Sequence, residues 1–386
     1  MAQAYIVDAV RTAGGKRKGA LASIHPADLG ATVLDALVDR SGVDPVAIDD
    51  VILGCVTQGG EQSFAFGRNA VLASKLPISV PAVTIDRQCG SSQQALQFAA
   101  QAVMSGTQDI VIAAGVESMT RVPMGSNFNL HAQAGLGEGP WSARIQKRFG
   151  VKGFSQFHGA QAIADKYGLT REDMDAYALE SHRKAAEAIA KGEFIAEIVP
   201  VETSAGIFAQ DEGVRSDGTM EALAGLKPLS EGGTITAGNA SQMTDAASGV
   251  LVVSEAALKR FNLTPIARVH NLTVSAGDPV IMLEEPIPAT KKALQRAGLK
   301  LHEIDLFEVN EAFACIPMAW LKATGADPNR LNINGGAIAL GHPLGASGTK
   351  LMATLIHALK SRGLRFGLQT MCEGGGIANV TIVEAL

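Results

Sequence analysis

Short apolar runs alternate with amphipathic stretches along the N-terminal third of the chain. The runs at residues 4–10 and 49–56 are rich in valine and isoleucine, which is typical of buried strands. Between them, leucine and valine recur at helical spacing over residues 26–39, and residues 69–76 favour a second helix. This alternation predicts an α/β fold in which helices cover a sheet.

A further apolar run, residues 80–85, stops shortly before Cys89, where a Gly-Ser-Ser segment opens a helix that ends near Gly106. Another buried strand is predicted at residues 109–114. A thiol at such a strand-to-helix junction lies beside unpaired backbone N–H groups and the positive end of the helix dipole, which favour the thiolate. We therefore expect Cys89 to be a nucleophile. The alternative is a free buried cysteine that only packs.

The C-terminal third repeats the pattern of the N-terminal third. Residues 35–53 and 292–309 each read as a helix, a glycine, a short link, Ile-Asp and a strand, with Gly42 matching Gly298. Two similar βαβα halves imply packed layers of sheet and helix that are related by a pseudo-dyad. Ligands are expected near the carboxyl ends of the strands, where the two halves meet.

The composition of the chain changes in its middle, where proline, glycine, asparagine and charged residues become frequent. We interpret residues 119–242 as an inserted loop domain that carries one clear helix at residues 171–190, with a near capping box at its start. The first half then comprises residues 1–118 and about 243–264, and the second half comprises residues 265–386.

Several cations are scattered through the inserted domain. They are Arg121, Arg144, Lys147, Arg148, Arg215 and Lys227. An ordinary solvated surface is one interpretation of these residues. The other is that a few of them form a rim for a phosphorylated ligand.

The composition excludes several classes of protein. Hydrophobic residues make up 47% and charged residues 18% of the 386 residues, so the chain can bury a large core and is not disordered. The net charge is -5 and no basic run could follow a phosphate backbone, which argues against a nucleic-acid partner. No stretch reaches the ~20 apolar residues of a membrane span, and the N-terminus lacks the pattern of a signal peptide. We expect a soluble, cytoplasmic protein with no membrane partner.

The four cysteines are Cys55, Cys89, Cys315 and Cys372. They are too few and too scattered for a disulfide framework, and no CxxC or HExxH spacing indicates a metal site. We therefore expect reduced thiols and no metal. Cys55 lies inside a predicted strand and is expected to be a core residue.

Three stretches of the second half place polar or reactive residues at strand ends. They are EVNEAFA (308–314), ALGHPLGASG (339–348) and MCEGGG (371–376). Across the pseudo-dyad they would face Cys89. His342 lies in a turn where it can face a cleft, or else it is a structural histidine. Cys372 precedes glycines that can bring N–H groups close to a ligand oxygen, or else it belongs to a plain hairpin turn. Asn310 on its own is more typical of a helix N-cap.

Taken together, these motifs resemble the thiolase family, acyl-CoA acyltransferases that cleave or form 3-ketoacyl-CoA. The stretches that carry the resemblance are VRTAGGKRKGAL, CGSSQQAL, GNASQMTDAAS, VNEAFA, GGAIALGHPLGASG and CEGGG. The forms DRQCGSSQQ and LQTMCEGGG look most like bacterial degradative thiolases, including those associated with steroid breakdown. The resemblance covers essentially the whole chain. It implies a thiolase-like αβαβα fold in five layers, coenzyme A as a substrate with no other cofactor, and a homodimer or a dimer of dimers. It also implies that the inserted domain, residues 119–242, binds CoA and makes oligomer contacts.

The resemblance also implies roles for single residues. Cys89 matches the nucleophile that becomes the acyl-enzyme, and His342 matches the histidine that activates it and, with Asn310, forms an oxyanion site. Cys372 matches the second cysteine, which acts as acid and base. Gly374 matches the glycine whose N–H joins that of Cys89 in a second oxyanion hole. Two cysteines that face one cleft could also oxidise to a disulfide, which would inactivate the enzyme reversibly.

Three further residues are candidates for substrate binding. Ser241 matches the serine near the pantetheine of CoA, and Arg215 belongs to the candidate phosphate rim. Residues 155–159 depart from the Met-Gly form of many members and residues 246–248 from Gly-Ala-Ala, so both bear on the shape of the acyl group. His158, in the first of these departures, could touch the ligand or simply pack.

Two other functions fit part of the pattern. A ketoacyl synthase-like condensing enzyme, decarboxylating or not, has the same broad fold; the decarboxylating form expects two histidines opposite the cysteine, and Cys372 argues against it. A non-catalytic protein that binds acyl-CoA or lipid would have lost Cys89, His342 or Cys372, and all three are present. We therefore expect thiolytic cleavage of a 3-ketoacyl-CoA, or the reverse Claisen condensation.

Overall fold

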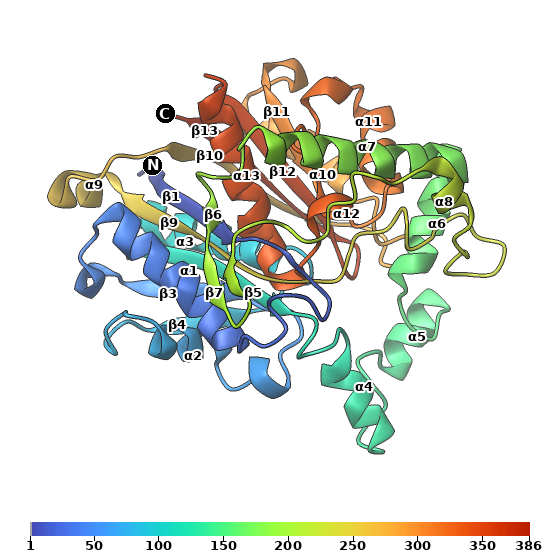
Figure 1. The fold of residues 1–386 in the computed structure, drawn as a ribbon, viewed down its shortest axis with the longest axis horizontal. Helices are drawn as coiled ribbons and strands as arrows, with labels where there is room; N and C mark the ends of the chain where they lie inside the picture. The colour runs from blue at the N-terminus through green and yellow to red at the C-terminus, as the bar shows by residue number, and fades with distance from the viewer. Residues whose placement is uncertain (1) are drawn as a thin grey trace.

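A mixed sheet of eleven strands runs through the molecule, and a two-stranded hairpin forms separately (Figure 1). The computed structural model describes residues 2–386. The strands are β1 (Ala4–Thr12), β2 (Gly15–Lys16), β3 (Asp50–Gly54), β4 (Ala82–Ile85), β5 (Ile110–Ser118), β6 (Ile198–Val199), β7 (Val201–Thr203), β8 (Gly206–Phe208), β9 (Thr244–Ser254), β10 (Ala267–Ala276), β11 (Leu306–Val309), β12 (Phe366–Glu373) and β13 (Ile377–Ala385). The α-helices are α1 (Pro26–Ser41), α2 (Phe66–Ala73), α3 (Ser91–Ser105), α4 (Ser126–Gln133), α5 (Ala143–Phe149), α6 (Gln156–Tyr167), α7 (Arg171–Ala190), α8 (Met220–Ala224), α9 (Glu255–Phe261), α10 (Pro286–Ala297), α11 (Cys315–Thr324), α12 (Ala337–Leu340) and α13 (Ser347–Ser361).

The large sheet consists of two half-sheets with the same arrangement of strands. The first runs β4-β3-β5-β9-β1 and the second runs β11-β12-β13-β10. The pairs β3–β5 and β11–β12 are parallel, whereas the pairs β5–β9 and β12–β13 are antiparallel. The half-sheets join where β1 pairs antiparallel with β10, with Ile6 opposite Ala267. The predicted pseudo-dyad is confirmed, and it passes between β1 and β10.

The two half-sheets differ at their outer edges. The first ends in β4, which pairs along its whole length with β3. At the matching place in the second half, only a single bridge joins Phe307 to Leu331. The two half-sheets therefore share their strand arrangement but differ by one edge strand.

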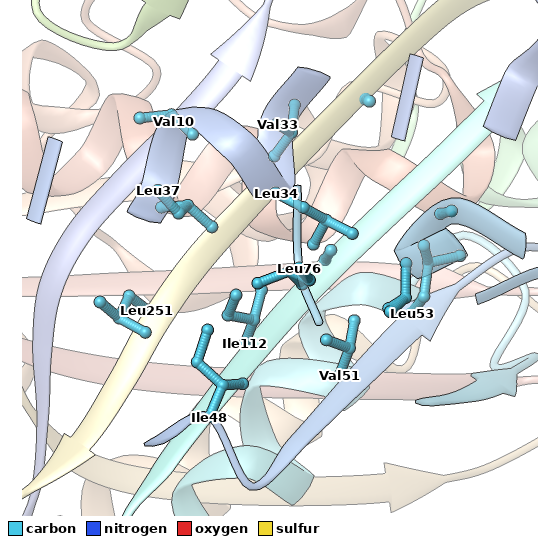
Figure 2. Packing of buried hydrophobic residues seen from close by; sticks show 14 of the residues in the cluster. Val10, Val33, Leu34, Leu37, Ile48, Val51, Leu53, Leu76, Ile112 and Leu251 are labelled. Carbon is cyan, nitrogen blue, oxygen red and sulfur yellow. The ribbon is translucent and has the colours of Figure 1, made fainter. Parts of the chain in front are cut away.

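Helices cover both faces of each half-sheet. Buried residues of α1 and α2 pack on one face of the first half-sheet, and Figure 2 shows Val33, Leu34 and Leu37 of α1 in one cluster with Val51 and Ile112 of the sheet. Full burial of each leucine contributes about 2 kcal/mol. Residues of α10 and α11 pack in the same way on the second half-sheet. Residues of α3 and α13 share one core between the two half-sheets, which gives the predicted αβαβα layers.

The matching glycines of the repeat have the same structural role. Gly42 ends α1 and Gly298 ends α10, with φ angles of 69° and 68°. This left-handed conformation costs a residue with a Cβ atom about 1 kcal/mol, so glycine is favoured at both places. The predicted repeat of helix, glycine and strand is therefore present in the structure.

Most predicted elements are present, some with shifted ends. The helix α7 has the predicted bounds and a complete capping box at its start. The helix predicted at residues 69–76 begins earlier, at Phe66, and the strand predicted at residues 49–56 ends at Gly54. Cys55 therefore lies just beyond the strand, yet it is fully buried, as expected for a core residue.

The regular structure between β5 and β9 is mainly helical, and long irregular stretches connect the helices. The helices α6 and α7 pack against the second half, where Ile163 and Met174 share a hydrophobic cluster with Phe313. The helices α4 and α5 stand away from both halves (Figure 1) and bury none of their residues. Within residues 2–386, no helix combines the length and the apolar character needed to cross a membrane. The limits of the inserted domain, residues 119–242, stay a prediction.

The contact between α3 and α13 can be tested at Gly348. A Cβ atom added there would lie 2.0 Å from the backbone nitrogen of Gln93, so we expect Gly348→Ala to lower the free energy of unfolding by about 3 kcal/mol. Denaturant unfolding followed by circular dichroism measures this change. Gly225→Ala is the matched control, because Gly225 has φ -70° and its nearest new contact would be 3.5 Å. Equal unfolding midpoints for the two variants would contradict the close helix contact.

Candidate active site

Cys89 lies in a tight turn between β4 and α3. The Asp86 carboxylate accepts a hydrogen bond from the backbone N–H of Gln88 at 2.6 Å, and the Ser91 hydroxyl donates to the Gln88 carbonyl at 2.6 Å. Gln88 has a φ of 48°, in the left-handed region, where a residue with a side chain loses about 1 kcal/mol. The hydrogen bonds hold this strained turn and therefore fix the backbone of Cys89.

The CEGGG stretch lies directly against the Cys89 turn. A Cβ atom added to Gly90 would lie 1.9 Å from Oε1 of Glu373, and one added to Gly374 would lie 2.8 Å from Oε1 of Gln88. Cys372 is buried near the end of β12. The structure therefore brings the first and the last of the predicted site segments together from the two halves.

Desolvation controls the protonation of both thiols, although Cys89 is only half-buried and Cys372 is fully buried. It raises the pKa of the Cys89 thiol well above its ordinary value, and the proximity of Cys372 and Glu373 raises it further, because a thiolate there would lie close to two other acidic groups. Burial also raises the pKa of the Cys372 thiol, with contributions from Cys315 and Glu373. The predicted preference of Cys89 for the thiolate is therefore wrong for the resting protein, because desolvation outweighs the helix N-terminus. Each thiol needs a proton acceptor before it can react.

Glu373 is a site residue that the motifs do not identify. Its side chain is fully buried, and neither carboxyl oxygen has a hydrogen-bond partner among the described residues. Burial raises the pKa of Glu373 well above its ordinary value, more than the charge of Arg87 lowers it. Glu373 is therefore a neutral carboxylic acid beside the reactive thiols. The available sequence signal was an acidic residue inside a strand that is buried along its length.

His342 lies in the loop between α12 and α13 and is buried. Its backbone N–H donates to the Gln242 carbonyl at 2.9 Å. Its Nδ1 lies 2.5 Å from Oγ of Ser347, and the Ser347 hydroxyl donates to the Pro343 carbonyl at 2.9 Å. Because the hydroxyl proton is used there, we assign the imidazole proton to Nδ1. This assignment leaves Nε2 as an acceptor.

Asn310 provides the partner of that acceptor. Its Nδ2 lies 3.3 Å from Nε2 of His342. Burial and the charge of Lys350 lower the pKa of His342 to about 3, so the imidazole is neutral at physiological pH. The helix α11 begins only at Cys315 and has Ala314 as its N-cap, so the N-cap interpretation of Asn310 is wrong. Asn310 and His342 together form a neutral base with an amide donor beside it.

Glu117 connects two loops of the site and was also missed. Its carboxylate accepts hydrogen bonds from the backbone N–H groups of Val56 and Thr57 at 2.9 and 3.0 Å. It also accepts one from Gly345 at 2.8 Å, three residues after His342. The carboxylate therefore fixes the His342 loop to the first half-sheet. An acidic residue near the end of an otherwise apolar strand was the sequence signal for it.

A pocket of about 480 Å³ opens beside these groups. The predicted residues that line it are Ser241, Arg215 and His342. Its lining also includes Met119 and Leu344, against which Cys89 packs, so the pocket ends next to the thiol. His158 is exposed on α6 and lies outside the lining, whereas its neighbour Phe157 contributes to it.

The four cysteines are free thiols in the structure. Within the chain from residue 2 to residue 386, no three His, Cys, Asp or Glu side chains are grouped to hold a metal ion. Reversible oxidation of Cys89 with Cys372 stays a prediction.

The chain matches two family descriptions in tandem, "Thiolase, N-terminal domain" over residues 4–256 and "Thiolase, C-terminal domain" over residues 263–385. The chain belongs to the thiolase family. The family, the fold and the class of acyl-CoA acyltransferase that the motifs predict are thereby confirmed.

Relatives of this thiolase match along its whole length. The steroid 3-ketoacyl-CoA thiolase FadA6 of Mycobacterium tuberculosis is 53% identical over 388 residues, which cover 100% of this chain and 95% of that protein. The acetyl-CoA acetyltransferase of Escherichia coli is 42% identical over 395 residues, 100% of both chains. The crystal structure of the Bacillus anthracis acetyl-CoA acetyltransferase has a TM-score of 0.91 at 36% identity, over 100% of this chain and 99% of that chain.

The raised pKa of Cys89 can be measured by alkylation. Of the four cysteines of this thiolase, only Cys89 is partly exposed, so we expect iodoacetamide to label it alone in the folded protein. The labelling rate should rise about tenfold per pH unit from about pH 7 to about pH 9, because only the thiolate reacts. Timed labelling with peptide mapping measures both the site and the rate. A rate that levels off below about pH 8 would contradict the raised pKa.

Proposed function

We propose that this thiolase cleaves a 3-ketoacyl-CoA with CoA to acetyl-CoA or propionyl-CoA and a shortened acyl-CoA, or runs the reverse Claisen condensation. The observation that carries the proposal is the convergence of three segments beside one pocket: the Cys89 turn, the hairpin of Cys372 and Gly374, and the Asn310–His342 pair. They supply two thiols, a neutral base and amide donors. Acyl transfer between thioesters requires these groups.

Cys89 is the nucleophile in this proposal. Because its thiol is protonated at rest, Nε2 of His342 takes the proton as the sulfur attacks the keto carbon. The C2–C3 bond then breaks, its electron pair leaves with the enolate of acetyl-CoA, and the shortened acyl group stays on Cys89. His342 now carries a proton on Nε2 and can donate it in a hydrogen bond.

Amide and imidazole donors stabilise the negative oxygens of these steps. Asn310 and the protonated His342 face the enolate oxygen, and one such donor is typically worth ~3 kcal/mol. The N–H groups of Cys89 and Gly374 form the second oxyanion hole, which serves the tetrahedral intermediates. The close approach of Gly374 to Gln88, the residue before Cys89, supports this pairing.

Cys372 acts first as an acid and then as a base. Its thiol is protonated at rest because it is buried, so it can give a proton to the enolate carbon. The resulting thiolate takes the proton of an incoming CoA thiol, whose sulfur attacks the acyl group on Cys89. The bond between the acyl group and Cys89 breaks, the shortened acyl-CoA leaves, and the Cys89 sulfur takes its proton back from Nε2 of His342. Coenzyme A therefore takes part as a substrate. Both thiols must stay reduced for this chemistry, and we propose a cytoplasmic location on that ground.

Acetyl-CoA tests the nucleophile and the acid/base separately. Intact-mass spectrometry should show one acetyl group added to the wild-type protein and none added to Cys89→Ser. Cys372→Ala should still acquire the acetyl group, but its turnover in thiolysis should fall about a thousandfold, because proton transfer to and from the substrates is lost. An acetyl adduct that persists in Cys89→Ser, or undiminished turnover in Cys372→Ala, would contradict the proposed mechanism.

Ser241 and Arg215 are proposed to hold CoA. The backbone N–H of Ser241 donates to the Ala312 carbonyl at 2.9 Å, which fixes this residue in the pocket wall. Arg215 lines the pocket and remains exposed, so it can meet a phosphate without the cost of a buried charge. Arg215→Met should therefore raise KM for CoA, whereas the exposed Lys227, which is outside the lining, should tolerate the same change. The proposal does not extend to His158.

We propose a steroid-derived acyl group as the substrate. The 53% identity to a protein named steroid 3-ketoacyl-CoA thiolase supports this assignment. Met119, Met124 and Met243 line the pocket, and flexible methionine side chains adapt to bulky ligands. Thiolysis of short, long and steroid-side-chain 3-ketoacyl-CoA substrates should give the highest kcat/KM for the last class. A highest value for acetoacetyl-CoA would contradict the assignment.

We also propose a homodimer that forms through β4. In the described sheet β4 pairs only with β3, and apolar side chains on and near it are exposed: Phe64 (89%), Ile78 (80%) and Val83 (45%). An open strand edge with exposed apolar residues favours pairing with a second copy. In a dimer of dimers, the protruding α4 and α5 would supply the additional contacts. A monomer mass in sedimentation at micromolar concentration would contradict the dimer.

A further inference from the structure

Lys350 is a buried lysine that contacts the chain next to His342. Lys350 lies in the first turns of α13 and has a relative exposure of 2%. Its Nζ donates to the carbonyls of Leu340 and Gly341, the two residues before His342, at 3.1 and 3.4 Å. The ammonium therefore ties α13 to the chain on one side of the histidine, while Ser347 of the same helix holds the imidazole ring.

Lys350 belongs to a cluster of charged groups from several elements. Arg11 of β1 donates from Nε to Glu197 at 2.5 Å and from its two Nη atoms to Asp211 at 2.8 and 3.0 Å, and all three side chains are buried. Glu308 of β11 also faces the lysine, but burial and neighbouring carboxylates raise the pKa of Glu308, so it is neutral. Two cations then balance two carboxylates only while Lys350 carries its proton.

The remaining titratable group that faces Lys350 is His342 itself, whose pKa the ammonium lowers. Burial and the charge of Arg11 lower the pKa of Lys350 to about 8, against the opposing pull of Asp211, Glu197 and Glu308. Lys350 therefore loses its charge in a pH range where an arginine would keep it. That loss leaves a net negative charge beside the catalytic pair.

We propose that Lys350 is a positioning residue of the thiolase site, whose ammonium holds the His342 loop and places a positive charge behind the oxyanion donors. The inference rests on the proposed function, because it concerns the same histidine. Charge-assisted hydrogen bonds to the two carbonyls are stronger than those of a neutral amine. The charge itself stabilises the enolate that forms opposite Asn310 and His342, whereas in the acetylation of Cys89 the ammonium acts by holding His342 in place. Removal of the proton weakens both effects.

The experiment is single-turnover acetylation of Cys89 by acetyl-CoA, measured as a function of pH. The rate of the wild type should fall relative to Lys350→Arg by about tenfold between about pH 7 and about pH 9, because arginine keeps its charge. Lys350→Met should be slower than the wild type by about tenfold or more at neutral pH, and the two rates should converge in alkali. Lys322→Arg and Lys322→Met are matched controls, since Lys322 also donates to a carbonyl, that of Tyr167 at 2.7 Å, but on an exposed face. Their profiles should superpose on that of the wild type.

Superposed pH profiles of the wild type and Lys350→Arg would overturn the inference, as would wild-type acetylation by Lys350→Met at neutral pH. Thermal unfolding identifies variants that fold. If Lys350→Arg does not fold, the test uses the acetylation rate of Lys350→Met divided by that of the wild type. A ratio that stays constant with pH refutes the role of the ammonium. Absence of acetylation in the wild type at every pH would refute the proposed function and this inference together. Acetylation with pH-independent ratios would refute only the role of Lys350.

Discussion

The site depends on the close contact between the N-terminal ends of α3 and α13. Gly348 leaves no room for a Cβ atom against the backbone of Gln93, and the N–H of Thr349 donates to the Ser92 hydroxyl at 3.0 Å. The reactive residues stand just before these two helices, Cys89 before α3 and His342 before α13. Packing equivalent helices around the pseudo-dyad therefore brings a thiol and an imidazole to one place. Neither half of the fold contains that combination alone.

The exclusion of water from the active site determines which of its side chains are charged. Burial of an unpaired charge costs several kcal/mol, and the thiols, Glu373 and the imidazole accordingly rest in their neutral forms. In the proposed mechanism, charge develops only during the reaction, where N–H donors already point at the oxygens. The permanently charged groups lie outside the catalytic groups, where Arg11 forms ion pairs with two carboxylates.

Local pattern and the repeat were enough to predict the main strands and helices of the two halves, and the resemblance to thiolases supplied the five layers. The order of the motifs was enough to predict the segments that meet at the site. Contacts over long sequence distances were not predictable: Glu117 bonds to Gly345, and Glu373 abuts Gly90, through packing that no local pattern encodes. The protonation of Cys89 was misjudged for the same reason, since burial is a tertiary property. Local pattern alone favours an N-cap role for Asn310, because it cannot show that the chain between β11 and α11 is longer than a direct junction; the oxyanion role came from the resemblance to thiolases.

The unequal outer edges of the two half-sheets have a consequence for assembly. A duplicated sheet with an open edge strand at both ends could pair with a further chain at each end. Head-to-tail addition of chains could then continue without limit. Here one end carries β4, with exposed apolar residues near it, whereas at the other end the side chains of β11 are buried and Leu331 bridges the strand from outside. Pairing through β4, as proposed above, would then join two chains and stop, because the second edge is covered. Loss of symmetry at the rim thus protects an internally symmetric chain against polymerisation.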